Sequence, residues 1–243
     1  MLFAAAWHWH AVFRSRIVGR RGDLAKEYEV TILSTVLESH RYPQHALFRD
    51  IVLPGGATLS RLEWEDNCCG LACIQTILDA EGLPVPTLDT LLAEGIESGA
   101  YDAAKGWILR GLLELGRSYG LDGEVFPEAS IGFLESLPAV QITPIVSVSC
   151  NFPITPSAKG GHLVVFRGTR VSNAKGEVCY CDDPSTQGAI VDEVERTRFW
   201  SSFSGRALIL KSARTWQGLS SIIADKHSCY AQKKRSWGPC MSW

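Results

Sequence analysis

The chain has 243 residues, of which 46% are hydrophobic and 21% are charged, the composition of an ordinary globular protein. A net charge of −2 does not favour binding of the chain to nucleic acid or to an anionic membrane surface. No apolar run approaches the roughly 18 residues of a membrane span, so we expect no membrane segment. Four arginines follow the apolar residues 2–6 instead of preceding them, which is the wrong order for a signal peptide. We therefore expect a cytoplasmic protein whose eight cysteines are reduced.

The first part of the chain predicts an arm followed by helices. Residues 1–57 form an N-terminal arm in this interpretation, with possible strands at 28–35 and 47–53, where β-branched and apolar residues alternate or run together. Residues 69–80 are expected to be a helix because Leu71, Ile74, Ile77 and Leu78 recur on one side. Further helices are expected from residue 87, over 107–119, and after Ser130, which can cap a helix.

In the second part of the chain, the spacing of apolar residues changes from that of helices to that of strands. Strands are predicted at 145–148, 162–166, 178–181 and 207–210, with a helix over 191–203 before the last of them. Helices followed by strands indicate an α+β fold, in which an antiparallel sheet packs on a helical half. From residue 212 to 243 the chain is polar and basic without a visible period, so a poorly ordered tail is expected there.

A cysteine at the predicted start of a helix is the first candidate for chemistry. Cys69 begins the helix predicted at 69–80, and the dipole and free N–H groups of a helix N-terminus favour the thiolate, which is the nucleophile. The ordinary role of a cysteine is a small core residue, but Gly70 directly after Cys69 would let a substrate backbone approach. Cys68 competes for the same role.

A histidine and an aspartate downstream can complete a triad. His162 follows Gly160-Gly161 and opens a predicted strand, which would keep its ring accessible and rigidly held. Asp183 follows the strand at 178–181 and precedes Pro184, and Asp182 is its rival as the orienting carboxylate. The plain alternatives are a core or surface histidine and a turn-forming aspartate.

Together these motifs resemble the papain-like cysteine peptidases of family 39, which includes the domains that trim leaders from bacteriocin precursors. The resemblance covers roughly residues 58–211 and rests on Cys69-Gly70, the Gly161-His162 strand and Asp183-Pro184. It implies a papain-like fold in which the cysteine-bearing helix packs on an antiparallel sheet. It also implies Cys69 as nucleophile, His162 as base and Asp183 as orienter.

Two positions depart from the family pattern. Cys68 stands where the family usually has aspartate, and Glu63 stands at the oxyanion-hole position, where the family usually has glutamine. A carboxylate beside a developing negative charge would repel it, while an oxyanion donor contributes about 3 kcal/mol.

The sequence thus predicts a thiol hydrolase that cleaves a peptide or amide bond through an acyl-thioester on Cys69. Acyl transfer or cyclisation by the same centre is an alternative, and so is a degenerate member that only binds peptides. The partner is a peptide or acyl-amide substrate, with neither nucleic acid nor membrane. Cys179 and Cys181 lie on one face of a strand, but the chain has no Cys-x-x-Cys pair, so we expect no metal and no cofactor.

Overall fold

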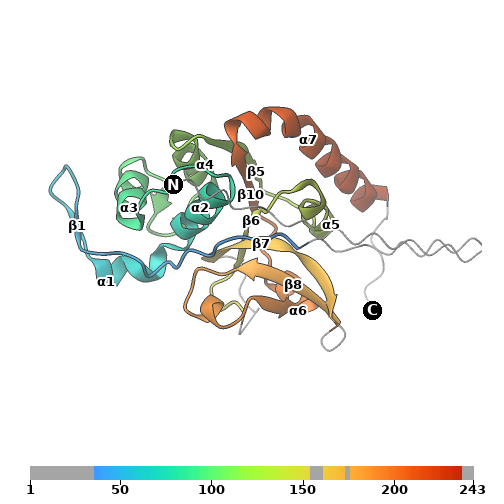
Figure 1. Ribbon diagram of the computed structural model, residues 1–243, viewed down its shortest axis with the longest axis horizontal. Helices are drawn as coiled ribbons and strands as arrows, with labels where there is room; N and C mark the ends of the chain where they lie inside the picture. The colour runs from blue at the N-terminus through green and yellow to red at the C-terminus, as the bar shows by residue number, and fades with distance from the viewer. Residues whose placement is uncertain (1–35, 154–160, 173–175, 237–243) are drawn as a thin grey trace, which may run out of the picture.

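A six-stranded antiparallel sheet forms the centre of the molecule (Figure 1). The structure is a computed structural model that describes residues 36–153, 161–172 and 176–236. The strands follow the order β5-β10-β6-β7-β8-β9, and each neighbouring pair is antiparallel. Their bounds are β5 Leu121–Phe126, β6 Ile145–Ser149, β7 Gly161–Ser172, β8 Gly176–Asp182, β9 Glu193–Glu195 and β10 Ala207–Ser212.

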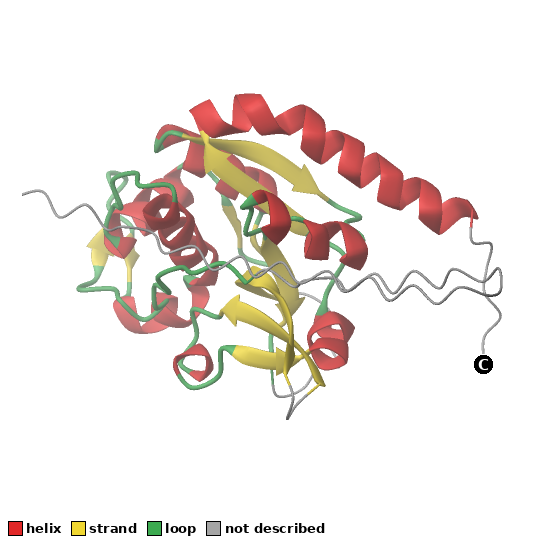
Figure 2. Cartoon of the chain, turned by 45° about the vertical axis from the view of Figure 1, so that its right-hand side comes forward, coloured by secondary structure: helices red, strands yellow, loops and turns green. Residues whose placement is uncertain are grey.

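Helices cover both faces of this sheet (Figures 1 and 2). One group comprises α2 Cys69–Ala80, α3 Leu88–Glu97 and α4 Leu109–Ser118, and the other comprises α5 Ile131–Ser136, α6 Arg196–Ser202 and α7 Ala213–Ser236. The short helix α1 Arg61–Trp64 precedes α2. Two small hairpins pair β1 Ile51–Val52 with β2 Thr58–Leu59, and β3 Tyr101–Asp102 with β4 Gly106–Trp107.

The two cores follow from side-chain alternation along the strands. Leu163 and Val165 of β7 lie in the core shared with α2, α3 and α4, while Val164 and Phe166 lie in the core on the other face. Successive side chains of a strand point to opposite faces, so a sheet buried on both sides reads as a continuous apolar run. The α+β prediction, with the cysteine-bearing helix packed on an antiparallel sheet, is therefore confirmed, with one addition. The sheet is covered by helices on both faces.

The predicted helix over 69–80 and the strands β6, β7, β8 and β10 agree with the structure. Ser130 caps α5 as expected, since its hydroxyl accepts a hydrogen bond from the Phe133 N–H. The helix expected over 107–119 begins only at Leu109, because Trp107 belongs to β4.

Other predicted elements differ from the structure. The helix expected over 191–203 is helical only over Arg196–Ser202, and the preceding residues form edge strand β9. In the stretch 47–53 only Ile51–Val52 is a strand, and the strand expected at 28–35 lies outside the described residues. Strand β5 was not predicted, because Asp122, Gly123 and Glu124 break its apolar pattern. Gly123 is required there, since a Cβ would lie 1.9 Å from the Ile209 carbonyl oxygen of β10.

The expectation of a poorly ordered tail from residue 212 is wrong for residues 213–236, which form the 24-residue helix α7. Trp216 and Ile223 are buried in the core with α5, and Leu219 and Tyr230 pack against that core. These four residues are separated by three, four and seven positions, which places them on one helical face. Most residues of this segment are polar, so the few apolar residues on one helical face are not evident from the sequence.

Replacing Ile223 by Ala tests whether α7 belongs to the folded core. Ile223 is fully buried, and truncating a buried isoleucine costs about 2 to 5 kcal/mol of unfolding free energy. Its neighbour Ile222 is 43% exposed, so Ile222→Ala should cost less than about 1 kcal/mol. Urea unfolding of both variants measures the difference. Equal, small losses in the two variants would show that α7 is detached from the core.

Candidate active site

Cys69 lies at the first position of α2 and opens onto a cavity of about 300 Å³. Cys68 is the N-cap residue, so the thiol of Cys69 sits at the positive end of a 12-residue helix. Cys69 is 7% exposed, and His162 and Trp107 line the same cavity. A thiol at a helix N-terminus that faces a cavity has the position that nucleophilic cysteines use.

His162 is the second residue of β7 and lies beside Cys69. Cys69 and His162 line the same cavity, the Cys69 side chain contributes to the raised pKa of His162, and His162 Nε2 lies 2.7 Å from Asp183 Oδ1. Because Nε2 is occupied by Asp183, Nδ1 is the ring nitrogen left for the sulfur. Gly161 before it has φ +101°, a conformation that L side chains rarely adopt, so glycine is needed where the strand begins.

Asp183 directly follows β8, and its carboxylate is buried against the histidine. Oδ1 also accepts a hydrogen bond of 2.9 Å from the Ser185 N–H, which fixes the carboxylate in the turn after the strand. Asp182 points to the other side, where it pairs with Arg167 Nε at 3.2 Å and accepts a hydrogen bond from Ser39. The structure thus brings Asp183, and not Asp182, to His162.

The electrostatics of this cluster favour a charged pair. Burial lowers the pKa of His162, but the hydrogen bonds to Asp183 and Cys69 and their negative charges outweigh it and raise the pKa to about 10. Burial raises the pKa of Asp183, yet the hydrogen bond and charge of His162 and the Ser185 N–H bring the net pKa below its usual value. At neutral pH an imidazole with this raised pKa is protonated.

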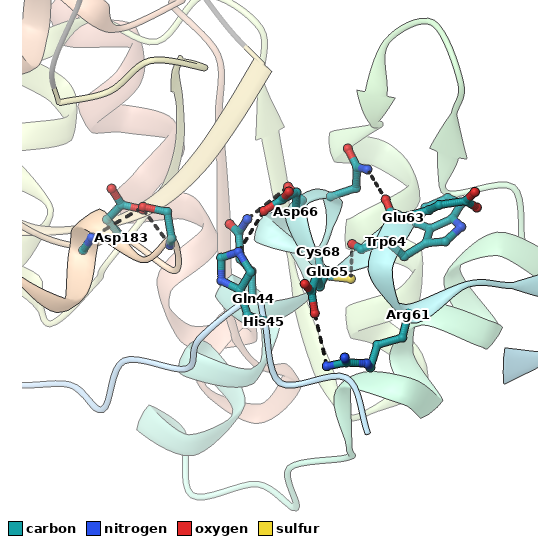
Figure 3. Close-up of polar contacts among 12 residues, drawn as sticks. Gln44, His45, Arg61, Glu63, Trp64, Glu65, Asp66, Cys68 and Asp183 are labelled. Carbon is teal, nitrogen blue, oxygen red and sulfur yellow. Dashed lines mark hydrogen bonds and ion pairs between the residues drawn. The ribbon is translucent and has the colours of Figure 1, made fainter. Parts of the chain in front are cut away.

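Cys68, the rival nucleophile, is a structural residue. Its side chain is fully buried, and its thiol donates to the Trp64 carbonyl oxygen at 3.2 Å (Figure 3). Burial, followed by the charge of Cys69, raises the pKa of Cys68 far above the usual range of a thiol. A thiol that is protonated and pointed into α1 does not act as a nucleophile.

Glu63, the residue predicted at the oxyanion position, lies outside the described lining of the Cys69 cavity. Glu63 lies in α1 with an exposed side chain, and the described residues that line the Cys69 cavity do not include it. Its backbone carbonyl accepts a hydrogen bond of 2.9 Å from the side-chain amide of Asn67, a residue that does line the cavity. The turn Glu65–Asn67 is a 3-10 helix inserted between α1 and α2, which separates Glu63 from the thiol.

Gly70 also has a different role from the one expected. A Cβ at this position would lie 2.9 Å from Leu112 Cδ1, 3.0 Å from Trp107 Cγ and 3.1 Å from Leu163 Cδ1. The glycine therefore lets α2 approach α4 and β7 closely, instead of leaving room for a substrate. The Trp107 indole N–H donates to the Asn67 carbonyl oxygen at 2.5 Å, which ties the β3–β4 hairpin to the loop before Cys69.

Residues 37–48, which we call the N-terminal strap, join the two loops that carry Cys69 and Asp183. Figure 1 shows this segment crossing in front of β7, and Leu37 N–H donates to the Arg167 carbonyl oxygen at 3.1 Å. Arg41 Nη1 donates to the carbonyl oxygens of Asp183 at 3.1 Å and Ser185 at 3.2 Å. The strap therefore holds the turn that presents the Asp183 carboxylate.

Gln44 of the strap contacts the turn before Cys69 and the loop after Asp183, and Figure 3 shows its contact with Asp66. Its backbone N–H donates to the Pro184 carbonyl oxygen at 2.9 Å, and its side-chain amide donates to the Asp66 carbonyl oxygen at 3.0 Å. Gln44 is only 4% exposed, and neighbouring His45 Nε2 lies 2.8 Å from Asp66 Oδ1. No sequence pattern predicts this role, because Gln44 lies more than a hundred residues from Pro184 along the chain.

Within the described ranges, no group of three or more His, Cys, Asp or Glu side chains is placed to hold a metal ion. Cys179 and Cys181 are buried in the core shared with α5, α6 and α7. In the same part of the chain, no helix has both the length and the apolar character that crossing a bilayer requires.

No protein-family model matches this sequence, and no curated protein sequence matches it. Several solved chains are similar to it, and two of them are peptidase domains of transporters. One is the peptidase domain of Streptococcus ComA, a bi-functional ABC transporter of a quorum-sensing pathway, with TM-score 0.44 and 16% identity over 60% of this chain and 91% of that chain. The other is a double-glycine-motif protease from an AMS/PCAT transporter in complex with the leader peptide, with TM-score 0.40 and 22% identity over 60% of this chain and 84% of that chain.

Replacing Asp183 by Asn tests the buried pair with His162. Removing one partner of such a pair costs about 3 kcal/mol of unfolding free energy or more. The folded-state pKa of His162, about 10, lies above its usual 6.5, so this stabilisation is complete below pH 6.5 and is lost as the pH rises through 10. Urea unfolding should show a larger loss for Asp183→Asn at pH 7 than at pH 10.

Asp182→Asn is the matched control, because it removes a neighbouring buried carboxylate on the opposite side of the strand. Its partner Arg167 stays charged throughout this pH range, so the loss should be the same at pH 7 and pH 10. A pH-independent loss for Asp183→Asn as well would mean that the His162 pair is not ionised in the folded protein.

Replacing Gln44 by Ala tests the N-terminal strap. The change removes the donor to the Asp66 carbonyl oxygen and should cost about 1 kcal/mol of unfolding free energy. It should also slow alkylation of Cys69 by iodoacetamide several-fold, because the loop before Cys69 is no longer tied to the loop after Asp183. Peptide mass mapping measures the rate at Cys69. Phe48→Ala, at a residue of the strap that is 77% exposed, should change neither quantity.

Proposed function

We propose that this protein is a thiol hydrolase that cleaves a peptide or amide bond, with Cys69 as nucleophile, His162 as acid and base, and Asp183 as orienter. The observation that carries the proposal is the chain of contacts from thiol to imidazole to carboxylate at the wall of one cavity. Each member has the setting that its role needs: a helix N-terminus, a rigid strand and a buried turn.

The reaction follows from these positions. The Cys69 thiolate attacks the substrate carbonyl carbon, and the carbonyl oxygen takes up the negative charge. The backbone N–H of Cys69 belongs to the first turn of α2, where N–H groups lack acceptors within the helix, and it can donate to that oxygen. Protonated His162 gives its proton to the leaving amine as the carbon–nitrogen bond breaks. A water molecule then gives a proton to His162 and cleaves the acyl-thioester, which releases the acid and restores the thiolate.

The cavity offers room and surface for a substrate backbone. Tyr101, Trp107 and Leu109 provide aromatic and aliphatic lining beside Cys69. Mostly apolar walls with a few converging polar groups are typical of ligand sites. Asp183 orients the imidazole through Nε2 of His162, and Cys69 lines the cavity.

The positions of Glu63 and Cys68 no longer favour a protein that only binds peptides. Glu63 has an exposed side chain away from the described cavity lining, so its charge does not oppose an oxyanion there. Cys68 is buried and donates to the Trp64 carbonyl oxygen, so it leaves Cys69 as the thiol that faces the cavity.

We also propose a cytoplasmic location. All seven cysteines in the described part of the chain are free thiols, and Cys69 has to remain reduced to act as a nucleophile.

An electrophilic peptide-like probe tests the nucleophile. Intact mass should rise by one probe at neutral pH, and peptide mapping should place it on Cys69. Cys69→Ser should lose this label and lower hydrolysis by roughly a thousandfold or more. Cys68→Ser, which changes a buried neighbour, should still be labelled at Cys69. Labelling that is equally fast in His162→Ala would argue against an activated thiol.

Replacing Glu63 by Gln tests the correction to the oxyanion position. The substitution restores the residue that the family pattern would have, but on an exposed side chain away from the described cavity lining. We therefore expect the labelling rate of Cys69 to stay within about twofold of the wild type across pH 6 to 8. A large gain would show that Glu63 reaches the thiol in the working protein.

A further inference from the structure

The cavity beside Cys69 carries a positively charged rim. Its lining includes three exposed cationic side chains from three separate elements: Lys105 in the turn between β3 and β4, Arg110 in the first turn of α4, and Arg206 directly before β10. Asp66 is the acidic residue among the described residues that line this cavity. Its carboxylate is already engaged, with Oδ1 at 2.8 Å from His45 Nε2.

Within the described part of the chain, these three cations have no acidic partner. Elsewhere, buried or half-buried cations pair with acids, as Arg167 does with Asp182 and Arg196 with Glu135. For Lys105, Arg110 and Arg206, the described residues provide no ion pair; Arg206 Nε has only a 3.4 Å contact with the Ser204 hydroxyl. The chain as a whole has a net charge of −2, so the positive rim is a local feature. Charges that stabilise nothing within the protein remain available to a ligand.

The N-terminus of α4 adds to the positive electrostatic potential at this cavity. Ile108, Leu109 and Arg110 line the cavity, and α4 begins there with no side-chain cap and no acidic residue in its first turn. The N-terminus of α2, which carries Cys69, likewise has no side-chain cap. Figure 1 shows α4 beside α2. Two helix N-termini therefore direct N–H groups and positive dipole ends toward one cavity.

We propose that the Cys69 cavity selects peptides with an acidic side chain, Asp or Glu, next to the bond that is cleaved. This inference rests on the proposed hydrolase function and names its substrate class. A substrate carboxylate would meet Lys105, Arg110 or Arg206 on the rim, and the exposed guanidinium groups suit two-point binding of a carboxylate. The thiolate itself is negative, so without this rim an acidic substrate would be repelled from the site.

Two alkylating reagents test the charge preference without requiring hydrolysis. Iodoacetate and iodoacetamide react with the same thiol and differ in one negative charge. The ratio of their rates at Cys69, measured by peptide mass mapping, should fall at least about twofold for each of Lys105→Gln, Arg110→Gln and Arg206→Gln at low salt. It should fall about tenfold in the triple variant, and the effect should shrink at 1 M salt, where charges are screened.

Arg214→Gln is the matched control. It removes an exposed positive charge at the other end of β10 from Arg206, so it should leave the ratio unchanged. All four residues are exposed, so thermal midpoints should stay close to the wild type. An unchanged ratio in the triple variant would overturn the proposal, whatever the enzyme hydrolyses.

Matched peptides test the substrate class directly. Two fluorogenic peptides that differ only in Glu or Gln beside the scissile bond should differ about tenfold in kcat/KM, and the triple variant should lose this difference. Equal cleavage of both peptides by the wild type would overturn the acidic preference while the hydrolase function stands. If neither peptide is cleaved, the hydrolase proposal fails, and the alkylation ratio decides by itself whether the cavity prefers anions.

Discussion

The hydrogen bond between His162 and Asp183 is the interaction on which the candidate site depends. It joins the start of β7 to the end of β8, two antiparallel neighbours whose pairing includes Val165 with Asp182. The sheet therefore sets the distance between imidazole and carboxylate before any ligand arrives. The bond occupies Nε2, leaves Nδ1 for the Cys69 sulfur, and supplies the negative charge that keeps the imidazole protonated. Rotation of either side chain would remove all three effects together.

The nucleophile reaches this pair through helix packing. Ten residues of α2 are buried, so the helix is enclosed by the sheet and by its neighbours, and its N-terminus is held at a fixed place. Gly70 allows Trp107, Leu112 and Leu163 to close around the first turn. Close packing therefore fixes the position of the α2 N-terminus more precisely than a loop would, because buried side chains hold the backbone in place.

The N-terminal strap adds a second restraint from outside the helix and the sheet. Arg41 and Gln44 bind mainly to backbone carbonyl oxygens of the loops around Asp183 and Asp66. Such contacts depend on the path of the backbone and not on the side chains it carries. The residues of the strap are absent from the described lining of the Cys69 cavity, so the strap restrains the loops without lining that cavity.

The sequence by itself determined the local elements and pointed to three candidate residues, Cys69, His162 and Asp183, that the structure places at one site. The helix at 69–80 has regularly spaced apolar residues, and its N-terminal cysteine has a chemical reason to ionise. The strands at 145–148 and 162–166 are largely apolar, and alternation along a strand allows only one of Asp182 and Asp183 to face His162. These are properties of a few consecutive residues, and the three-dimensional fold did not alter them.

Only the tertiary structure decided what lies around those residues. Glu63 is exposed and lies outside the described lining of the Cys69 cavity, and β5 forms because it pairs with β10 despite its polar residues. The apolar residues of α7 form a buried face only because Trp216 and Ile223 pack into a core built by other parts of the chain. Gln44, Lys105, Arg110 and Arg206 are distant from the reactive residues in sequence, and no local pattern marks them. Contacts between remote segments depend on how the whole chain packs, which a short stretch of sequence does not encode.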